Sequence, residues 1–148
     1  MIIKNIVIHH SASGLNTTVE QVDQWHKAKD YPKSSLGFYV GYHYFILKDG
    51  KIVQTRRDNE LGAHSPPNDG KIGICLAGNF MLQEPTAEQT KSLTELVGKL
   101  KTMYNINYVR AHRDFNKTDC PGNNLYKFSL IDQISWLRKL INILLNNK

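Results

Sequence analysis

The sequence predicts a single α/β domain, built as a central mixed β-sheet flanked by about three α-helices. Two observations lead to this fold class. Short β-branched apolar runs alternate along the chain with segments of helical periodicity. No internal repeat, low-complexity tract or linker divides the 148 residues, a length that suits one domain with one core. Residues 1–148 are therefore expected to form one domain.

The chain should begin with a buried strand followed by a helix. Residues 2–8 are β-branched and apolar and are followed by a Ser/Gly/Asn segment, which favours a strand. Thr17 and Glu20, three residues apart, have the pattern of a capping box and predict a helix start. Tyr31-Pro32 should end that helix, because the residue before a proline avoids helical geometry.

The middle of the chain should supply most of the sheet. Residues 38–47 are rich in aromatic and β-branched side chains and predict a strand. Lys48-Asp49-Gly50-Lys51 has the Asp-Gly signature of a tight hairpin, and 52–54 resume the sheet. Residues 56–70 are loop-like, and the apolar run 72–77 predicts a central strand.

Two further helices and a short strand are expected in the second half. Thr86 and Gln89 form a second capping box, and Asn105 should end the helix that they open. Residues 106–110 predict a short strand. The apolar stripe of the first helix comprises Leu93, Leu96, Val97, Leu100 and Met103 or Tyr104. A C-terminal helix, capped by Ser129, should carry the stripe Leu130, Ile134, Leu137, Ile141 and Leu144.

Composition limits the classes of partner. The formal charge is +6 and the pI is about 9.3, so the surface should attract polyanions without choosing among them. No Lys/Arg block is present, so no nucleic-acid partner is expected. The apolar runs are shorter than the ~20 residues of a membrane helix, and residues 1–8 lack the features of a signal peptide. We expect a monomer that is made in the cytoplasm and does not insert into membranes.

The two cysteines have different surroundings. Cys75 lies in an apolar run, where a small hydrophobic residue would serve equally well, whereas Cys120 lies in a polar loop before Pro121-Gly122. One disulfide is possible, but two cysteines do not make a disulfide framework.

Three residues that follow predicted strands have the chemistry of zinc ligands. His112 and Cys120 lie eight positions apart, and His9 lies at the end of the first strand. A single histidine more often serves packing, but three ligands held on rigid strand ends, with water as the fourth, are typical of a catalytic zinc. A fourth protein ligand, Asp114 or Asp119, would instead indicate a structural zinc or a regulator that binds another protein.

Tyr42 is a candidate for a catalytic role. A phenol beside the metal could donate a hydrogen bond to an oxyanion or orient the nucleophile. As a half-buried sheet aromatic it would need no such role. Because strand residues alternate, Tyr42 and His43 cannot both face one site.

Five segments in order resemble the zinc N-acetylmuramoyl-L-alanine amidases, the superfamily that joins phage amidase lysins to peptidoglycan recognition proteins. The resemblance spans roughly residues 3–125. The matching segments are 6–12 (Ile-Val-Ile-His-His-Ser-Ala), 40–44 (Val-Gly-Tyr-His-Tyr), 62–64 (Gly-Ala-His), 73–80 (Gly-Ile-Cys-Leu-Ala-Gly-Asn-Phe) and 111–122 with its His-x7-Cys-Pro block.

The resemblance implies roles for individual residues. The family's zinc ligands fall on His9, His112 and Cys120, and its tyrosine near the metal falls on Tyr42. Phage members often have a lysine two residues before the cysteine, where this chain has Thr118, as recognition proteins do. This places a cationic general acid in doubt, but the hydroxyl can still hydrogen-bond an oxyanion.

Other positions are implied to touch substrate or to be structural. His64 and Asn79 match positions that would contact substrate in the groove. His10, His26 and His43 match no ligand position and are expected to be structural or surface residues.

The implied function is hydrolysis. A protein of this family would use one zinc ion, in a groove at the edge of the sheet, to cleave the amide bond between N-acetylmuramic acid and L-alanine of peptidoglycan. A phage or prophage-type endolysin, acting on the cell wall after lysis-associated release, is the leading hypothesis. The alternatives are a non-catalytic peptidoglycan-binding module and a cytoplasmic amidase that recycles soluble muropeptides.

Overall fold

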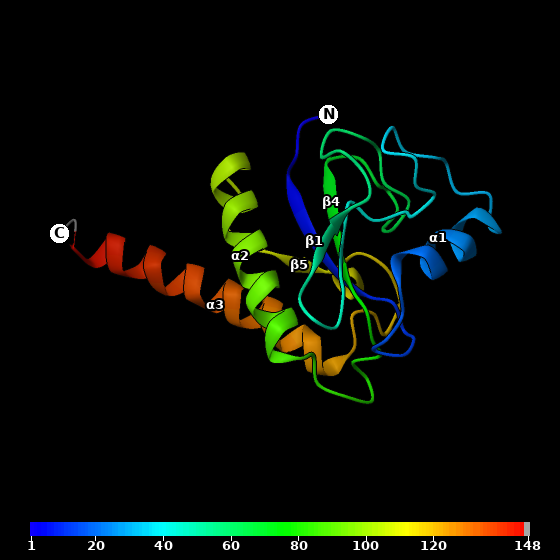
Figure 1. The fold of residues 1–148 in the computed structure, drawn as a ribbon. Helices are drawn as coiled ribbons and strands as arrows, with labels where there is room; N and C mark the ends of the chain where they lie inside the picture. The colour runs from blue at the N-terminus through cyan, green and yellow to red at the C-terminus, as the bar shows by residue number, and fades with distance from the viewer. Residues whose placement is uncertain (147–148) are drawn as a thin grey trace.

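A computed structural model describes residues 1–146 and shows a five-stranded mixed sheet in the order β3-β2-β4-β1-β5 (Figure 1). The strands are β1 (Asn5–His10), β2 (Tyr44–Ile46), β3 (Ile52–Gln54), β4 (Lys71–Leu76) and β5 (Arg110–Ala111). β1 pairs in parallel with β4 and β5, β2 pairs in parallel with β4, and β2 and β3 form an antiparallel hairpin. The predicted mixed sheet is confirmed.

Three helices flank this sheet, as predicted. They are α1 (Val19–Lys27), α2 (Ala87–Tyr104) and α3 (Asn123–Asn146), and a short 3₁₀ turn, η1 (His112–Asp114), follows β5. Figure 1 shows α2 and the start of α3 on one side of the sheet and α1 on the other, while the later part of α3 projects away from the body. Within residues 1–146, no helix has the length and apolar character needed to cross a bilayer.

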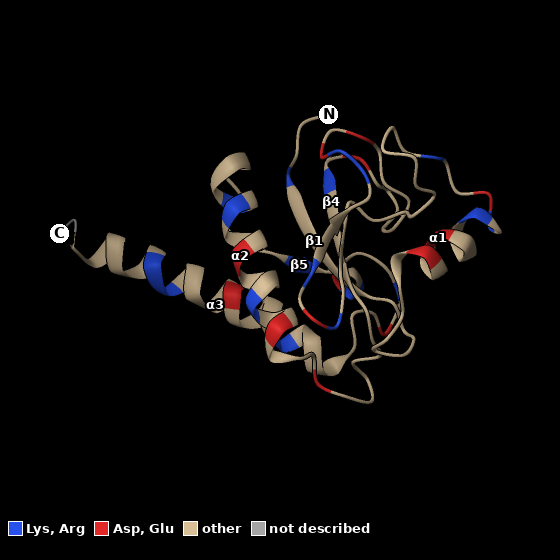
Figure 2. Cartoon of the chain, viewed as in Figure 1, with Lys and Arg blue, Asp and Glu red and all other residues tan. Residues whose placement is uncertain are grey.

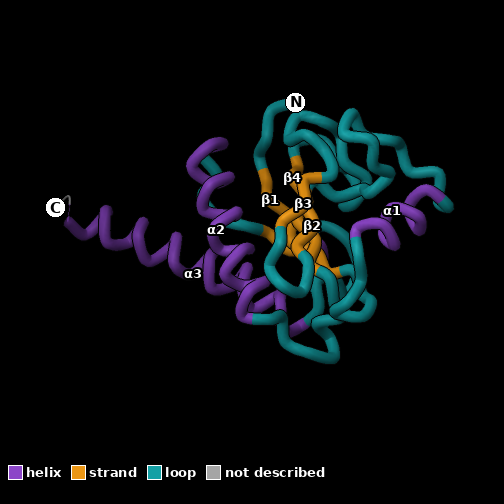
Figure 3. Tube along the Cα trace, viewed as in Figure 1, coloured by secondary structure: helices purple, strands orange, loops and turns teal. Residues whose placement is uncertain are grey.

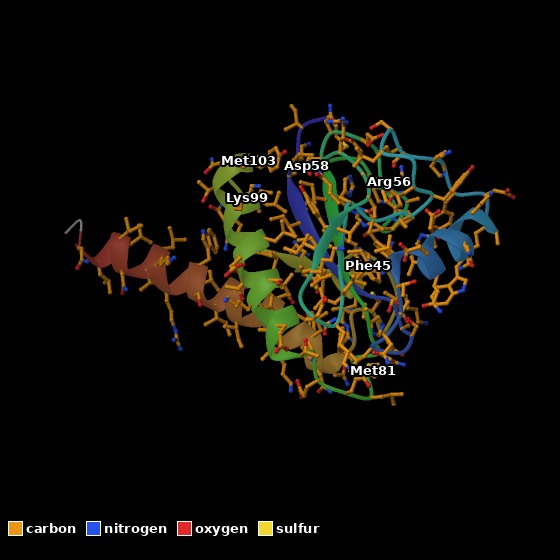
Figure 4. The ribbon with its side chains drawn as sticks, in the orientation of Figure 1. Phe45, Arg56, Asp58, Met81, Lys99 and Met103 are labelled. Atoms are coloured by element: carbon orange, nitrogen blue, oxygen red, sulfur yellow. The ribbon has the colours of Figure 1, made fainter. Side chains whose placement is uncertain are left out.

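The two faces of the sheet pack against different layers, because successive strand residues point to opposite sides. Ile8 and Ile74 belong to the main core, which includes Leu93 and Leu100 of α2. The opposite face carries a smaller cluster that includes Val22 of α1, Phe45 and Cys75, and Figure 4 labels Phe45 near the middle of the molecule. His9 is paired with Cys75 in the β1–β4 register and therefore lies on this second face.

Irregular segments complete the cover of the second face, and Figure 3 shows them as loops between the sheet and α1. Arg56, labelled among these loops in Figure 4, is buried and joins them. Its guanidinium donates hydrogen bonds to the carbonyl oxygens of Val40 (2.8 Å), Leu61 (3.4 Å) and Pro32. One buried cation thereby satisfies three carbonyls from two loops, the α1–β2 loop and the β3–β4 loop, which fixes the cover over the site described below.

The strand predicted over 38–47 is wrong for its first part, because only Tyr44–Ile46 is a strand. Gly41 approaches the next loop so closely that an added Cβ would lie 2.3 Å from the Ala63 carbonyl oxygen. The Ala63 N–H donates to the Gly41 carbonyl oxygen at 2.9 Å. The backbone before β2 thus bonds to a loop instead of continuing the sheet.

The two predicted capping boxes have different outcomes. That of α2 is confirmed, with Thr86 and Gln89 bonded reciprocally, and left-handed Asn105 (φ 54°) ends this helix. That of α1 is shifted by one residue, since Thr18 and Gln21 form it. The Thr17 hydroxyl instead donates to the Gly14 carbonyl oxygen at 2.7 Å.

The strand expected over 52–54 is confirmed as β3, whereas the boundaries of three other elements differ from those predicted. The first strand covers Asn5–His10 rather than 2–8, and the strand predicted over 106–110 is reduced to Arg110–Ala111. The C-terminal helix starts at Asn123, so Ser129 is not its cap. The Ser129 hydroxyl lies inside the helix and donates to the Tyr126 carbonyl oxygen at 2.9 Å.

Candidate metal centre

His9, His112 and Cys120 lie together at one edge of the sheet. Their potential ligand atoms are all within 4.8 Å of one another. The Cys120 Sγ is 3.6 Å from the His9 Nδ1, and the imidazole centroids of His9 and His112 are 4.6 Å apart. Residues separated by more than a hundred positions thus form one cluster of metal-binding character.

The parallel pairing of β1 with β5 explains why the two histidines meet. Ile8 is the register partner of Ala111, and the residue that follows each of them in the chain is a histidine. Parallel strands end at the same edge, so His9 and His112 emerge side by side.

Backbone and side-chain hydrogen bonds hold the loop that carries Cys120. The Arg113 N–H donates to the Cys120 carbonyl oxygen at 3.0 Å, and the Arg113 guanidinium donates to the Asp119 carbonyl oxygen. The Thr118 hydroxyl oxygen accepts from the Cys120 N–H at 3.2 Å. Gly122 (φ 87°) closes the loop where an added Cβ would lie 2.4 Å from the Phe80 carbonyl carbon, so only glycine fits there.

The second nitrogen of His9 contacts His64. The His9 Nε2 and the His64 Nδ1 are 2.9 Å apart. When His9 Nδ1 serves as a ligand, its Nε2–H donates to His64, the arrangement by which proteins orient ligating histidines. The sequence indicated a substrate contact for His64 and missed this one, because 55 positions separate the two residues and no local pattern links them.

His64 also borders a groove beside the cluster. It lines a cavity of about 360 Å³ together with His112, Tyr31, Ala63, Pro66 and Asn68. Its Nε2 is buried and has no hydrogen-bond partner within residues 1–146. His64 therefore stands between the ligand His9 and the groove.

The electrostatics of the cluster suit a divalent cation. Burial lowers the pKa of His9 and of His112 below the usual value, so both rings are neutral at pH 7 and able to ligate. Burial raises the pKa of the Cys120 thiol to about 12. A bound cation reverses that effect by stabilising the thiolate. Two neutral imidazoles and a thiol that a cation deprotonates fit zinc.

The two aspartates considered as a fourth ligand lie outside this cluster of described residues. The Asp114 carboxylate accepts from the Ala111 N–H at 2.8 Å and from the Tyr126 hydroxyl at 3.1 Å. Asp119 is exposed and contributes its backbone carbonyl to the loop. Three protein ligands leave one position of a tetrahedral zinc for water or substrate.

Tyr42 packs on His9, with ring centroids 5.0 Å apart. Its ring also packs against the buried cluster that includes Cys75, and burial raises the tyrosine pKa well above its usual value, so Tyr42 remains a phenol. Cys75 is a fully buried member of that cluster, as its apolar run predicted. Both cysteines are free, so the disulfide left open from the sequence is absent from the described chain.

Asn79 lies in the turn after β4, where its side-chain oxygen accepts from the Met81 N–H at 3.1 Å. Figure 4 labels Met81 on this turn. Among the described residues no hydrogen bond joins Asn79 to the three ligand residues, and its contact with substrate stays a prediction.

The three histidines without a ligand role are structural. Each accepts a hydrogen bond from a backbone N–H through Nδ1: His10 from Phe80 (3.1 Å), His26 from Gly41 (2.9 Å) and His43 from Gly73 (3.0 Å). His43 faces away from Tyr42 and packs against the far side of His64, with centroids 5.6 Å apart.

Comparison with known families identifies the family and the fold. The model of the family described as Amidase_2, N-acetylmuramoyl-L-alanine amidase, matches residues 1–123. The chain belongs to this amidase family. The matched part contains His9, His112 and Cys120 and ends where α3 begins.

Relatives within the family include both lytic enzymes and recognition proteins. The chain is 34% identical over 132 residues to peptidoglycan recognition protein 1 of Bos indicus, covering 84% of this chain and 70% of the relative. It is 31% identical over 136 residues to the endolysin of Enterobacteria phage T3, covering 83% of each.

Solved structures of both kinds share the fold. The amidase LysC from Clostridium intestinale is 36% identical and superposes with a TM-score of 0.75, covering 84% of this chain and 79% of that one. A chain from the ectodomain complex of peptidoglycan recognition proteins LCa and LCx, solved with tracheal cytotoxin bound, matches at 26% identity and a TM-score of 0.71, covering 86% of this chain and 80% of that one.

Proposed function

We propose that this amidase-family protein is a zinc hydrolase that cleaves the amide bond between N-acetylmuramic acid and the L-alanine of peptidoglycan, as a phage or prophage endolysin released by lysis. The cluster of His9, His112 and Cys120, with ligand atoms within 4.8 Å of one another, carries the proposal. A zinc ion held there would supply an acidified water as nucleophile and would polarise the scissile carbonyl.

The protein's own groups would bind and orient the reactants. His64 holds His9 in the tautomer that presents Nδ1 to the cluster. Tyr42, kept protonated by burial, would donate a hydrogen bond to the oxyanion that develops on the scissile carbonyl.

Thr118 is the second proposed donor. Its hydroxyl oxygen accepts from the Cys120 N–H, which leaves the hydroxyl hydrogen free to donate. The groove bordered by His64 would take the substrate, with Asn79 as a further contact.

Substitution of each cysteine tests the metal site. Cys120→Ser should lose stoichiometric zinc and reduce the release of stem peptide from muropeptides by at least ~100-fold, because a hydroxyl is a poor substitute for thiolate. Cys75→Ala is the matched control and should retain one zinc per chain. Full activity in Cys120→Ser would remove Cys120 from the ligand set.

Substrate preference separates an endolysin from the two other activities open to this fold. The wild-type protein should digest intact sacculi at least as readily as soluble muropeptides. A strong preference for soluble muropeptides would indicate a recycling amidase. Binding of sacculi without release of any stem peptide from the zinc-loaded protein would indicate a recognition module.

A further inference from the structure

From Leu130 onward, α3 presents a row of exposed Leu and Ile side chains. Their exposed fractions are Leu130 40%, Ile134 48%, Leu137 48%, Ile141 53% and Leu144 61%. A contiguous exposed apolar row marks an interaction surface. Figure 1 shows this part of α3 extending beyond the body, and Figure 2 shows few charged positions on it.

The body of the protein holds the other side of α3. The Asp132 carboxylate accepts hydrogen bonds from the Lys101 ammonium (2.7 Å) and from the Val109 N–H (2.8 Å). One turn later, the Trp136 ring packs on Tyr108, with centroids 5.3 Å apart. Residues four apart share a helix face, so the docked side runs through Asp132 and Trp136 and the apolar row points outward.

The spacing within the row indicates what covers it. The five residues follow intervals of four, three, four and three positions, which is a heptad seam. Isoleucine occupies both a positions, and leucine occupies all three d positions: the a positions are 134 and 141, and the d positions are 130, 137 and 144. In a parallel coiled coil, β-branched residues at a with leucine at d favour two strands over three or four.

The residues flanking the seam favour a parallel orientation. In a parallel pair, a g residue faces the e residue of the next heptad of the other strand. Gln133 would then face Arg138 of the second copy, and Leu140 would face Leu145, so no like charges meet. An antiparallel pair centred on Leu137 would bring the two Arg138 side chains together, which is unfavourable.

The area of the row suits a stable dimer. The seam is widened by three further side chains, Ile131 (64% exposed), Leu140 (39%) and Leu145 (64%). At ~100 Å² for each of these half-exposed side chains, one copy offers ~800 Å², the area that one partner contributes to an interface of standard size.

We propose that the protein forms a homodimer through a parallel two-stranded coiled coil of residues 130–145, replacing the monomer expected from the sequence. α3 lies beyond the residues matched by the amidase family, so the dimer is an addition to the catalytic domain. A dimer carries two copies of the site, so on a polymeric wall the second copy would bind at a raised effective concentration.

Sedimentation equilibrium tests the dimer, using the full-length wild type and two single variants substituted at neighbouring positions. The wild type should be dimeric at ~100 µM, and Ile141→Asp should weaken association at least tenfold by placing a charge in the seam. Asn142→Asp adds the same charge on the polar side and should remain dimeric. A monomeric wild type, or an unchanged dimer in a folded Ile141→Asp protein, would overturn the proposal. Circular dichroism and hydrolysis of soluble muropeptides report whether each variant is folded.

Cross-linking tests the orientation. Leu144→Cys should form a disulfide-linked dimer on mild oxidation, because identical d positions face each other in a parallel coil. Lys139→Cys, on the outer face, should not. Absence of cross-linking in a dimeric Leu144→Cys protein would exclude the parallel arrangement. A monomer that instead sediments with phosphatidylglycerol vesicles would assign the row to a membrane surface.

Discussion

At the residue scale, His9 divides its two ring nitrogens between different contacts. Nδ1 faces Cys120 at 3.6 Å, whereas Nε2 is 2.9 Å from His64. The first contact belongs to the metal cluster and the second fixes the direction of the ring. Each nitrogen therefore has a distinct and separately testable role.

Removing His64 should weaken the metal site. We expect His64→Ala to lower zinc affinity by ~10- to 100-fold, the usual cost of losing the group that orients a ligating histidine. Competition with a chromophoric chelator measures this affinity. Tyr31→Phe, which alters another residue lining the same cavity, should leave zinc affinity unchanged. If His64→Ala raised the KM without changing zinc affinity, His64 would be a substrate contact alone.

Two structural histidines should make stability depend on pH. Burial lowers the pKa of His10 and of His26 from 6.5 to about 4. As the pH falls, the unfolded chain therefore binds protons at these two histidines before the folded chain does. The free energy of unfolding should be highest above pH 6.5 and should decrease between pH 6.5 and 4, by up to ~1.4 kcal/mol per pH unit for each histidine.

Urea denaturation of the metal-free protein between pH 7 and 4.5 measures this dependence. His26→Gln retains an acceptor for the Gly41 N–H and removes one titrating group, so its stability should depend less steeply on pH. If the free energy of unfolding of the variant depended on pH as steeply as that of the wild type, His26 would not contribute to the pH dependence.

At the element scale, the sequence predicts which segments form helices and strands. It predicts less reliably the residue at which each element begins. Both ends of α2 were predictable because a capping box and a left-handed asparagine are local signals. The α1 box was misplaced because Thr17 and Thr18 each have a Glu or Gln three residues later, and only tertiary contacts decide between them. The exposure of the α3 stripe was likewise unpredictable, since periodicity does not say what packs on a stripe.

The candidate site likewise has features that the sequence predicts and features that it does not. That His9, His112 and Cys120 lie together was predictable, because each follows a strand or closes a polar loop. The contacts of His64 and of Tyr42 with His9 were not, because they depend on the paths of irregular segments over the sheet.

β4 must contain glycine where His64 packs. A Cβ on Gly73 would lie 2.8 Å from atoms of the His64 ring. We expect Gly73→Ala to destabilise the fold by ~1–3 kcal/mol and to weaken zinc binding, because the ring must move away from His9. Thermal denaturation and chelator competition measure the two effects.

Gly98→Ala is the control for this substitution. A Cβ there meets nothing within 4 Å, and alanine favours the helical conformation of α2, so stability should rise by ~0.5–1 kcal/mol. Equal effects of the two substitutions would contradict the packing explanation.

At the scale of the whole molecule, one face of the sheet carries the main hydrophobic core and the other carries the candidate site. α2 and the start of α3 cover the face that carries the main core. The opposite face carries His9 under α1 and a set of loops joined by Arg56. Binding groups can thus vary on the loops while the core stays intact.

The chemical identity of the released product tests the central claim most directly. Sacculi digested with the zinc-loaded protein should release stem peptides with a free N-terminal L-alanine, which mass spectrometry detects, and should gain no new reducing sugar ends. Metal-free protein and Cys120→Ser should release none. Release of muropeptides with the lactyl–alanine amide intact, or binding of sacculi without any cleavage, would contradict the assignment as an amidase.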